Sequence, residues 1–157
     1  MSYIELKSGT DIRGVASDLG GKKVNLTEEA VYDITAAFIV WYINKYEKNS
    51  AEMNVAVGHD SRITGEKIGA KVKEALINAG VSVIDCGLAS TPAMFMTTVD
   101  LNADAAIQIT ASHHPFDRNG LKFFTPDGGL DSENISEIVK LADNGEEIIC
   151  NRAGVTM

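Results

Sequence analysis

The 157-residue chain is 45% hydrophobic, which suits one compact domain with a buried core. Its formal net charge of −8 argues against a nucleic-acid partner, because phosphate backbones favour basic surfaces. The longest apolar run, residues 36–43, is too short to span a bilayer, and the N-terminus carries no signal-peptide pattern. We therefore expect a soluble, cytoplasmic protein with no membrane partner.

The first distinctive stretch is residues 8–14. Gly9 and Gly14 lie near its two ends and predict a tight loop, and Arg13 offers a planar guanidinium that suits phosphate oxygens. An ordinary turn with a solvated arginine is the alternative.

The first helix is predicted to follow Thr27, which is a suitable N-cap residue, and to run to about residue 45. Apolar side chains recur at helical spacing along it and favour core packing: Val31, Ile34, Phe38, Trp41 and Tyr42.

A buried strand is predicted at residues 54–58, because its side chains are almost all apolar. The loop at residues 58–65 leads into a second helix that ends at Gly80. A strand, a glycine-bounded loop and a helix can offer backbone N–H groups to an anion, but the Gly-Lys-Ser/Thr ending of a Walker loop is missing. The alternative is a plain connection with Thr64 as a cap and an exposed pair of Asp60 and Arg62.

The second half of the chain continues the alternation. Strands are predicted at residues 81–85, 105–109 and 121–125. A helix is predicted to begin at Pro92 with Thr91 as its cap, and a last helix follows Asp131 or Ser132. The apolar face of that last helix consists of Ile135, Ile138, Val139 and Ala142.

These elements predict an α/β fold, a three-layer α/β/α sandwich with a mixed, mainly parallel four-stranded sheet. No crossover helix joins strands 105–109 and 121–125, so the latter is expected to pair antiparallel at the edge of the sheet. We assign residues 1–145 to one domain and residues 146–157 to a linker or a truncated end.

The loop between strands 105–109 and 121–125 carries most of the chemistry. Ligands of open α/β sheets bind at the carboxyl ends of strands, which is where this loop begins. A serine hydroxyl is a weak nucleophile, so Ser112 needs a base or carries a group that reacts for it. A phosphate on Ser112 would bring roughly −1.5 to −2 charges and require cations or a metal. Candidate partners nearby are His113, Arg118 and Lys122; the alternative is an ordinary turn.

Cysteine and histidine spacings do not indicate a metal site. Cys86 and Cys150 form no CxxC pair, so both are expected to be reduced thiols, with Cys86 half-buried. The histidines His59, His113 and His114 lack the helical i, i+4 spacing of a zinc-binding pair.

Residues 110–122 resemble the active-site serine loop of the α-D-phosphohexomutases, the phosphoglucomutase/phosphomannomutase family. The usual pattern is Thr-Ala-Ser-His-Asn-Pro followed by Asn-Gly-x-Lys, and His114 stands where the family usually has asparagine. Three further segments resemble family elements in the same order: residues 9–14 with Arg13, residues 58–65 with Asp60 and Arg62, and residues 90–92. The matching positions in the serine loop are Thr110, Ala111, Ser112, His113, Pro115, Asn119, Gly120 and Lys122.

The resemblance implies a mechanism. Phosphorylated Ser112 would give its phosphoryl group to a hexose 1- or 6-phosphate, and the sugar 1,6-bisphosphate would reorient and return the other phosphate. Lys122 and Arg13 would bind phosphate, stabilise charge and assist proton transfer, while His113 would orient the phosphate or the serine. Mg²⁺ would be held by a phosphoserine oxygen of Ser112 and by carboxylates of another domain.

Family members are much longer, and the family's Asp-x-Asp-x-Asp magnesium loop, sugar loop and C-terminal phosphate loop are not found here. The chain is therefore interpreted as the first domain of a phosphohexomutase, inactive alone, with the remaining domains and a hexose phosphate as partners. Thr110 favours glucose or mannose phosphates. The alternatives are a phosphoglucosamine mutase domain and a non-catalytic phosphate-binding or interaction module.

Overall fold

The computed structural model describes residues 2–111, 114–148, 154 and 156. Within them a seven-stranded sheet runs in the order β1-β2-β6-β5-β3-β4, and β7 pairs with β6. The strands are β1 Lys7–Ser8, β2 Asp11–Val15, β3 Asn54–His59, β4 Ser82–Leu88, β5 Ala105–Ile109, β6 Arg118–Thr125 and β7 Gly128–Gly129.

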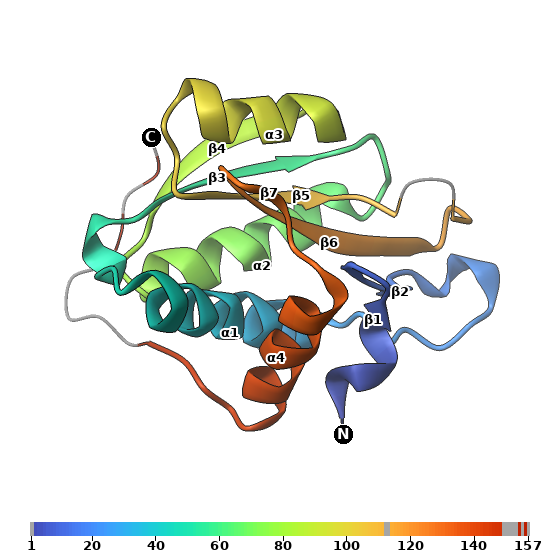
Figure 1. Cartoon of the computed structure of the whole chain (residues 1–157). Helices are drawn as coiled ribbons and strands as arrows, with labels where there is room; N and C mark the ends of the chain where they lie inside the picture. The colour runs from blue at the N-terminus through green and yellow to red at the C-terminus, as the bar shows by residue number, and fades with distance from the viewer. Residues whose placement is uncertain (1, 112–113, 149–153, 155, 157) are drawn as a thin grey trace.

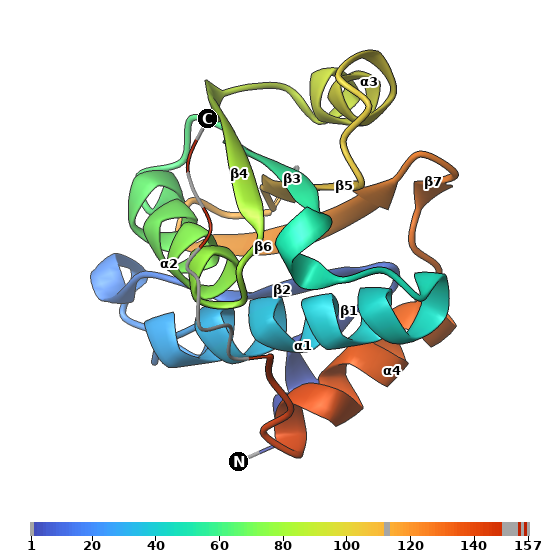
Figure 2. The same ribbon diagram turned by 90° about the vertical axis from the view of Figure 1, so that its left-hand side faces the viewer.

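Helices cover both faces of this sheet, as the three-layer prediction requires (Figures 1 and 2). The helices of the described residues are α1 Glu28–Tyr46, α2 Gly65–Asn78, α3 Thr91–Asp100 and α4 Ser132–Asp143, and short 3-10 turns occupy Tyr3–Leu6 (η1), Asp18–Gly20 (η2) and Ser50–Glu52 (η3). Helices α1, α2 and α4 lie on one face of the sheet, and α3 lies on the other. No helix in the described part of the chain is long and apolar enough to cross a bilayer.

The mixed sheet is confirmed, but its strands number more than the four predicted. Among the named strands of the described residues, β3 pairs in parallel with β4 and β5, and the pairs β5–β6, β6–β2, β2–β1 and β6–β7 are antiparallel. The antiparallel pairing of the strand after the serine loop is confirmed. Its predicted place at the edge is wrong, because β2 pairs with its other side.

The tight loop predicted at residues 8–14 is limited to a turn at Gly9 and Thr10, where Gly9 has a φ of 61°, and residues 11–14 belong to strand β2. Ile12 and Val15 are buried, and β2 pairs with a strand more than a hundred residues later in the chain. That pairing partner, rather than any local pattern, makes this short segment extended.

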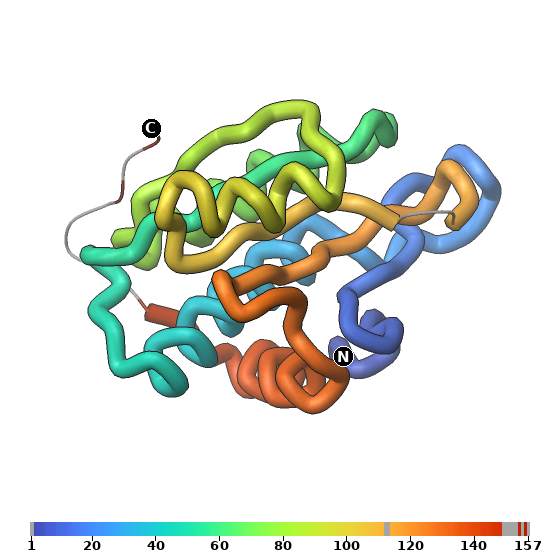
Figure 3. Tube along the Cα trace, turned by 45° about the horizontal axis from the view of Figure 1, so that its top comes forward, coloured from blue at the N-terminus to red at the C-terminus, as the bar shows by residue number. Residues whose placement is uncertain are grey.

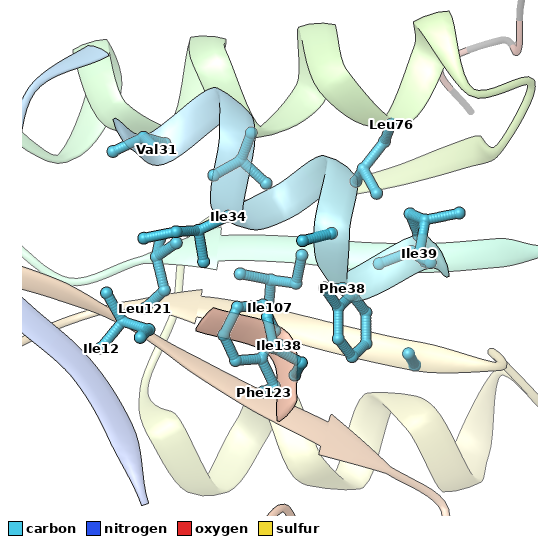
Figure 4. Packing of buried hydrophobic residues seen from close by; sticks show 14 of the residues in the cluster. Ile12, Val31, Ile34, Phe38, Ile39, Leu76, Ile107, Leu121, Phe123 and Ile138 are labelled. Atoms are coloured by element: carbon cyan, nitrogen blue, oxygen red, sulfur yellow. The ribbon is translucent and has the colours of Figure 1, made fainter. Parts of the chain in front are cut away.

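The main core lies between the sheet and the three helices on one face. The apolar stripe predicted for the first helix is buried there, and the Phe38 ring stacks on Phe123 of β6 with centroids 4.6 Å apart. Figure 4 shows Leu76 of α2 and Ile138 of α4 in the same cluster. This packed layer fixes the sheet on which the candidate site is built.

The helix caps agree with the sequence in two of four cases. Thr27 and Asp131 cap α1 and α4, as predicted. The cap of α3 is Ser90 rather than Thr91, because the helix begins one residue earlier than expected. Thr64 makes no side-chain cap bond, since its backbone is helical rather than extended as in an N-cap, and its hydroxyl accepts a hydrogen bond from Asn119.

Candidate functional site

Loops that follow three strands gather at one end of the sheet (Figures 1 and 3). The loop after β3 is joined to β5 because Asp60 N donates to Ile109 O at 3.1 Å. The loop after β2 is joined to the segment before β6 because Ala16 N donates to Asp117 O at 2.8 Å. Segments distant in the sequence thus surround the serine loop.

The predicted catalytic residues Ser112 and His113 lie outside the described residues, as does Cys150. On either side of the pair the loop is well defined by backbone bonds. His114 N donates to Ala111 O at 3.0 Å, and Arg118 N donates to Pro115 O at 3.0 Å.

Arg62 ties this loop to the loop after β3. Its guanidinium donates to Pro115 O at 2.7 Å, to Arg118 O at 3.1 Å and to His114 O at 2.8 Å. The Arg62 side chain is 13% exposed and Asp60 is 28% exposed, so the alternative of an exposed salt pair is wrong. A planar guanidinium presents its donors in a rigid fork that suits three carbonyls at fixed positions, whereas an ammonium carries its three donors on a flexible stem.

Asp60 supports the start of the same loop. One carboxylate oxygen accepts from the Thr110 hydroxyl at 2.7 Å, and the other accepts from Arg62 N at 3.1 Å. Asp60 and Arg62 therefore act on the backbone and the first residue of the serine loop.

Asn119 and Gly120 shape the far end of the loop. The buried Asn119 amide donates to the Thr64 hydroxyl at 2.8 Å, which ties β6 to the start of α2. A Cβ on Gly120 would lie 2.2 Å from Ile12 O and 2.9 Å from both Arg13 Cγ and Thr110 O. Only a glycine therefore lets the Arg13 side chain lie against β6 at this position.

Arg13 and Lys122 are brought together by a carboxylate that the sequence reasoning did not select. Asp11 accepts from Arg13 Nη2 at 2.8 Å with one oxygen and from Lys122 Nζ at 3.0 Å with the other. All three side chains project from the α3 face of the sheet, because side chains of a strand alternate and Ile12 and Leu121 enter the main core. Two cations against one carboxylate leave a net positive charge in an acidic protein.

Arg118 does not join this cluster. Its buried Nε has no hydrogen-bond partner in the part of the chain that the structure describes, although its carbonyl binds Arg62. Lys122 Nζ, by contrast, has a second contact, because it lies 5.8 Å from the centroid of the Phe124 ring.

The residues described do not supply a magnesium-binding carboxylate set. No group of three or more His, Cys, Asp or Glu side chains with metal-binding geometry is found among them. Both oxygens of Asp11 already contact cations, and both oxygens of Asp60 accept hydrogen bonds. Cys86 is half-buried, as predicted, and burial raises the pKa of its thiol.

A family model described as phosphoglucomutase/phosphomannomutase, alpha/beta/alpha domain I, matches residues 6–148. The chain belongs to this family. The predicted resemblance is confirmed, and the match extends three residues beyond the domain end predicted at residue 145.

Two of the similar curated proteins are named phosphoglucosamine mutase. A phosphoglucosamine mutase of Shouchella clausii is 39% identical over 142 residues, and one of Leuconostoc citreum is 34% identical over 154 residues. These alignments cover 88% and 95% of this chain but 29% and 32% of the relatives. The chain therefore spans about a third of the length of the curated relatives it matches.

A solved structure supports the fold. The phosphoglucomutase/phosphomannomutase family protein of Burkholderia thailandensis superposes with a TM-score of 0.81 at 22% identity. The match covers 100% of this chain and 33% of that one. The phosphohexomutase domain I architecture is thus found in the structure as well as in the sequence.

Proposed function

We propose that this chain is the phosphoserine-bearing domain of a phosphohexomutase that interconverts hexose 1-phosphates and hexose 6-phosphates. The supporting observation is the placement of Arg13 and Lys122 around Asp11. Arg13 pairs with Gly120, and Gly120 O accepts from Thr110 N at 3.0 Å, two residues before Ser112. Two cations therefore lie beside the backbone that leads to the proposed nucleophile.

The reaction is a transfer of one phosphoryl group between oxygens. The bond from Ser112 Oγ to phosphorus breaks as a sugar hydroxyl oxygen bonds to the phosphorus, and the proton of that hydroxyl passes to Ser112 Oγ. The resulting bisphosphate reorients and returns its other phosphoryl group to Ser112 Oγ. Arg13 and Lys122 bind the phosphate oxygens and stabilise their charge, which is the main task of a protein in such a reaction. Lys122 also assists proton transfer, and His113 orients the serine phosphate.

We propose that magnesium would be bound jointly by this domain and by other domains of the parent enzyme. When bound, it offsets the negative charge of the transferring phosphate. In this chain its proposed ligand is a phosphate oxygen on Ser112. Because the described carboxylates near the site are engaged by cations and hydroxyls, the other ligands are assigned to the remaining domains of the parent enzyme.

The identity of the hexose remains a separate proposal. Thr110 favoured glucose or mannose phosphates, but the relatives of Shouchella clausii and Leuconostoc citreum are named phosphoglucosamine mutases. We therefore propose glucosamine phosphate as the second candidate substrate. Comparing kcat/KM of the parent enzyme on the 1-phosphates of glucose, mannose and glucosamine separates the candidates, because specificity is a ratio of these constants.

The decisive experiment compares mutase turnover of the full-length parent with that of Ser112→Ala. Loss of a covalent nucleophile should lower kcat by several orders of magnitude. Activity within a few-fold of the wild type would refute the proposal. The 157-residue chain alone should show no turnover, even with magnesium and a sugar bisphosphate, and measurable turnover would contradict the assignment of magnesium ligands to other domains.

The competing candidate is a non-catalytic phosphate-binding module, since the net positive Asp11, Arg13 and Lys122 cluster would suit an anion in either case. Such a module would bind hexose phosphate with equal affinity in the wild type and in Ser112→Ala, and neither protein would convert it.

A further inference from the structure

Asp11 is a buried carboxylate with no role in the proposed reaction. It is 5% exposed, and each of its oxygens contacts a different cation. A buried charge is costly unless it is paired, and here the pairing uses both oxygens. The two partners are the cations assigned to phosphate binding.

Backbone register explains how one carboxylate reaches both cations. In the β2–β6 pair, Ile12 lies opposite Leu121 and Arg13 lies opposite Gly120. The same register continued by one residue sets Asp11 opposite Lys122. Arg13 is two residues along β2, so its side chain leaves the same face as that of Asp11.

We propose that Asp11 is a positioning residue that holds the Arg13 guanidinium and the Lys122 ammonium in place before an anionic sugar phosphate arrives. This inference rests on the proposed function. Without Asp11, two like charges on long side chains would repel each other and turn toward solvent, since Arg13 and Lys122 are 16% and 28% exposed. With Asp11 in place, both side chains are already ordered before the substrate binds.

A purely structural role is the competing explanation, because the same ion pairs join β2 to β6. The two roles differ in what a substitution changes. A structural carboxylate affects the stability of the sheet, whereas a positioning carboxylate affects turnover in a protein that is still folded. Asp104 provides a matched control, because it also pairs with a lysine, Lys48, and accepts from Asn54 N at 2.8 Å, but belongs to the start of β3 and β5 rather than to the serine loop.

The test uses the parent enzyme as the wild type, Asp11→Asn and Asp104→Asn. We expect Asp11→Asn to lower kcat about 100-fold, the order of loss caused by misplaced catalytic groups, with a smaller change in KM. Asp104→Asn should lower the thermal midpoint of unfolding about as much as Asp11→Asn does, but it should leave kcat within about twofold of the wild type. A kcat for Asp11→Asn within about threefold of the wild type, in a preparation where the wild type is active, would overturn the inference without touching the proposed function.

A second measurement does not depend on mutase activity. In the 157-residue chain, the hydrogens of the Lys122 ammonium should exchange with solvent more slowly in the wild type than in Asp11→Asn, as followed by lysine side-chain NMR. Equal exchange rates would overturn the inference. If Asp11→Asn does not fold, Asp11→Glu replaces it, because the charge is kept while the carboxylate moves by one methylene group. Its kcat should fall at least about tenfold relative to Asp104→Glu, and equal kcat values would overturn the inference.

Discussion

The Thr110 hydroxyl donates to a carboxylate oxygen of Asp60 at 2.7 Å, which joins the first residue of the serine loop to the loop after β3. Thr110 is 5% exposed, so the bond lies under the site rather than at its surface. Because Asp60 also accepts from Arg62 N, one carboxylate links two loops that leave parallel neighbouring strands.

Thr110→Val tests this link. Valine has nearly the same shape but no hydroxyl, so Asp60 loses a donor and the folded state should lose about 1 to 3 kcal/mol. Urea unfolding of the 157-residue chain measures the change. The matched control is Thr35→Val in α1, whose buried hydroxyl donates to Val31 O within the same helix and should matter less. Equal losses in the two variants would contradict the special role of the Asp60 contact.

Arg62→Lys tests the contacts to the serine loop backbone. Lysine keeps the charge but cannot bind three carbonyls with a planar fork, so we expect about 2 kcal/mol of destabilisation and reduced turnover in the parent enzyme. Arg62→Met should cost more, since it also removes the charge beside Asp60. If Arg62→Lys matches the wild type in both stability and turnover, the carbonyl contacts do not support the loop.

Gly120→Ala tests the close approach of β2 to β6. A Cβ would lie 2.2 Å from Ile12 O, a backbone atom that cannot move without separating the strands. We expect a loss of about 3 kcal/mol or more. Gly129→Ala is the control, because its nearest contact would be an ordinary 3.8 Å from Phe124. Similar thermal midpoints for the two variants would show that β2 and β6 are less closely packed than described.

The raised pKa of Tyr42 leads us to expect that the free energy of unfolding falls at alkaline pH. Burial, with a smaller contribution from the charge of Asp104, raises the pKa of Tyr42 from 10.0 to about 12. Between these values the unfolded chain loses this proton and the folded chain keeps it, so stability that is complete below pH 10 is lost as the pH rises toward 12. The slope approaches about 1.4 kcal/mol per pH unit. Unfolding free energies measured across this range should fall less steeply for Tyr42→Phe, and parallel curves would contradict the raised pKa.

Local sequence patterns were sufficient to predict the helices and the three parallel strands β3, β4 and β5. The apolar face of α4 lies within a single segment, so its burial follows from spacing alone, whereas α1 is buried at every residue from Ile34 to Tyr42 and not on one face only. Strand β2 was missed because its five residues become a strand through pairing with β6, which no local pattern encodes. The role of Asp11 was not predicted because its partner Lys122 lies 111 residues later in the chain. The position of Asp11, two residues before Arg13, was the one local feature that could have indicated it.

The Thr64 hydroxyl illustrates a different limit. Its residue type and position favoured a helix cap, but its backbone is helical rather than extended, and its hydroxyl accepts from the buried Asn119 amide. Asn119 lies 55 residues later in the chain, so no local pattern reveals this contact. The sequence could therefore predict the residue types at the site more readily than the contacts among them.

The central claim is that Ser112 carries the phosphoryl group during turnover. Its most direct test is the intact mass of the parent enzyme after incubation with a hexose 1,6-bisphosphate, followed by mapping of the modified residue. The account predicts one added phosphate on Ser112 that disappears when hexose monophosphate is supplied, and no added phosphate in Ser112→Ala. A wild-type enzyme that turns over with Ser112 unmodified, or a Ser112→Ala variant that gains the same phosphate, would contradict it.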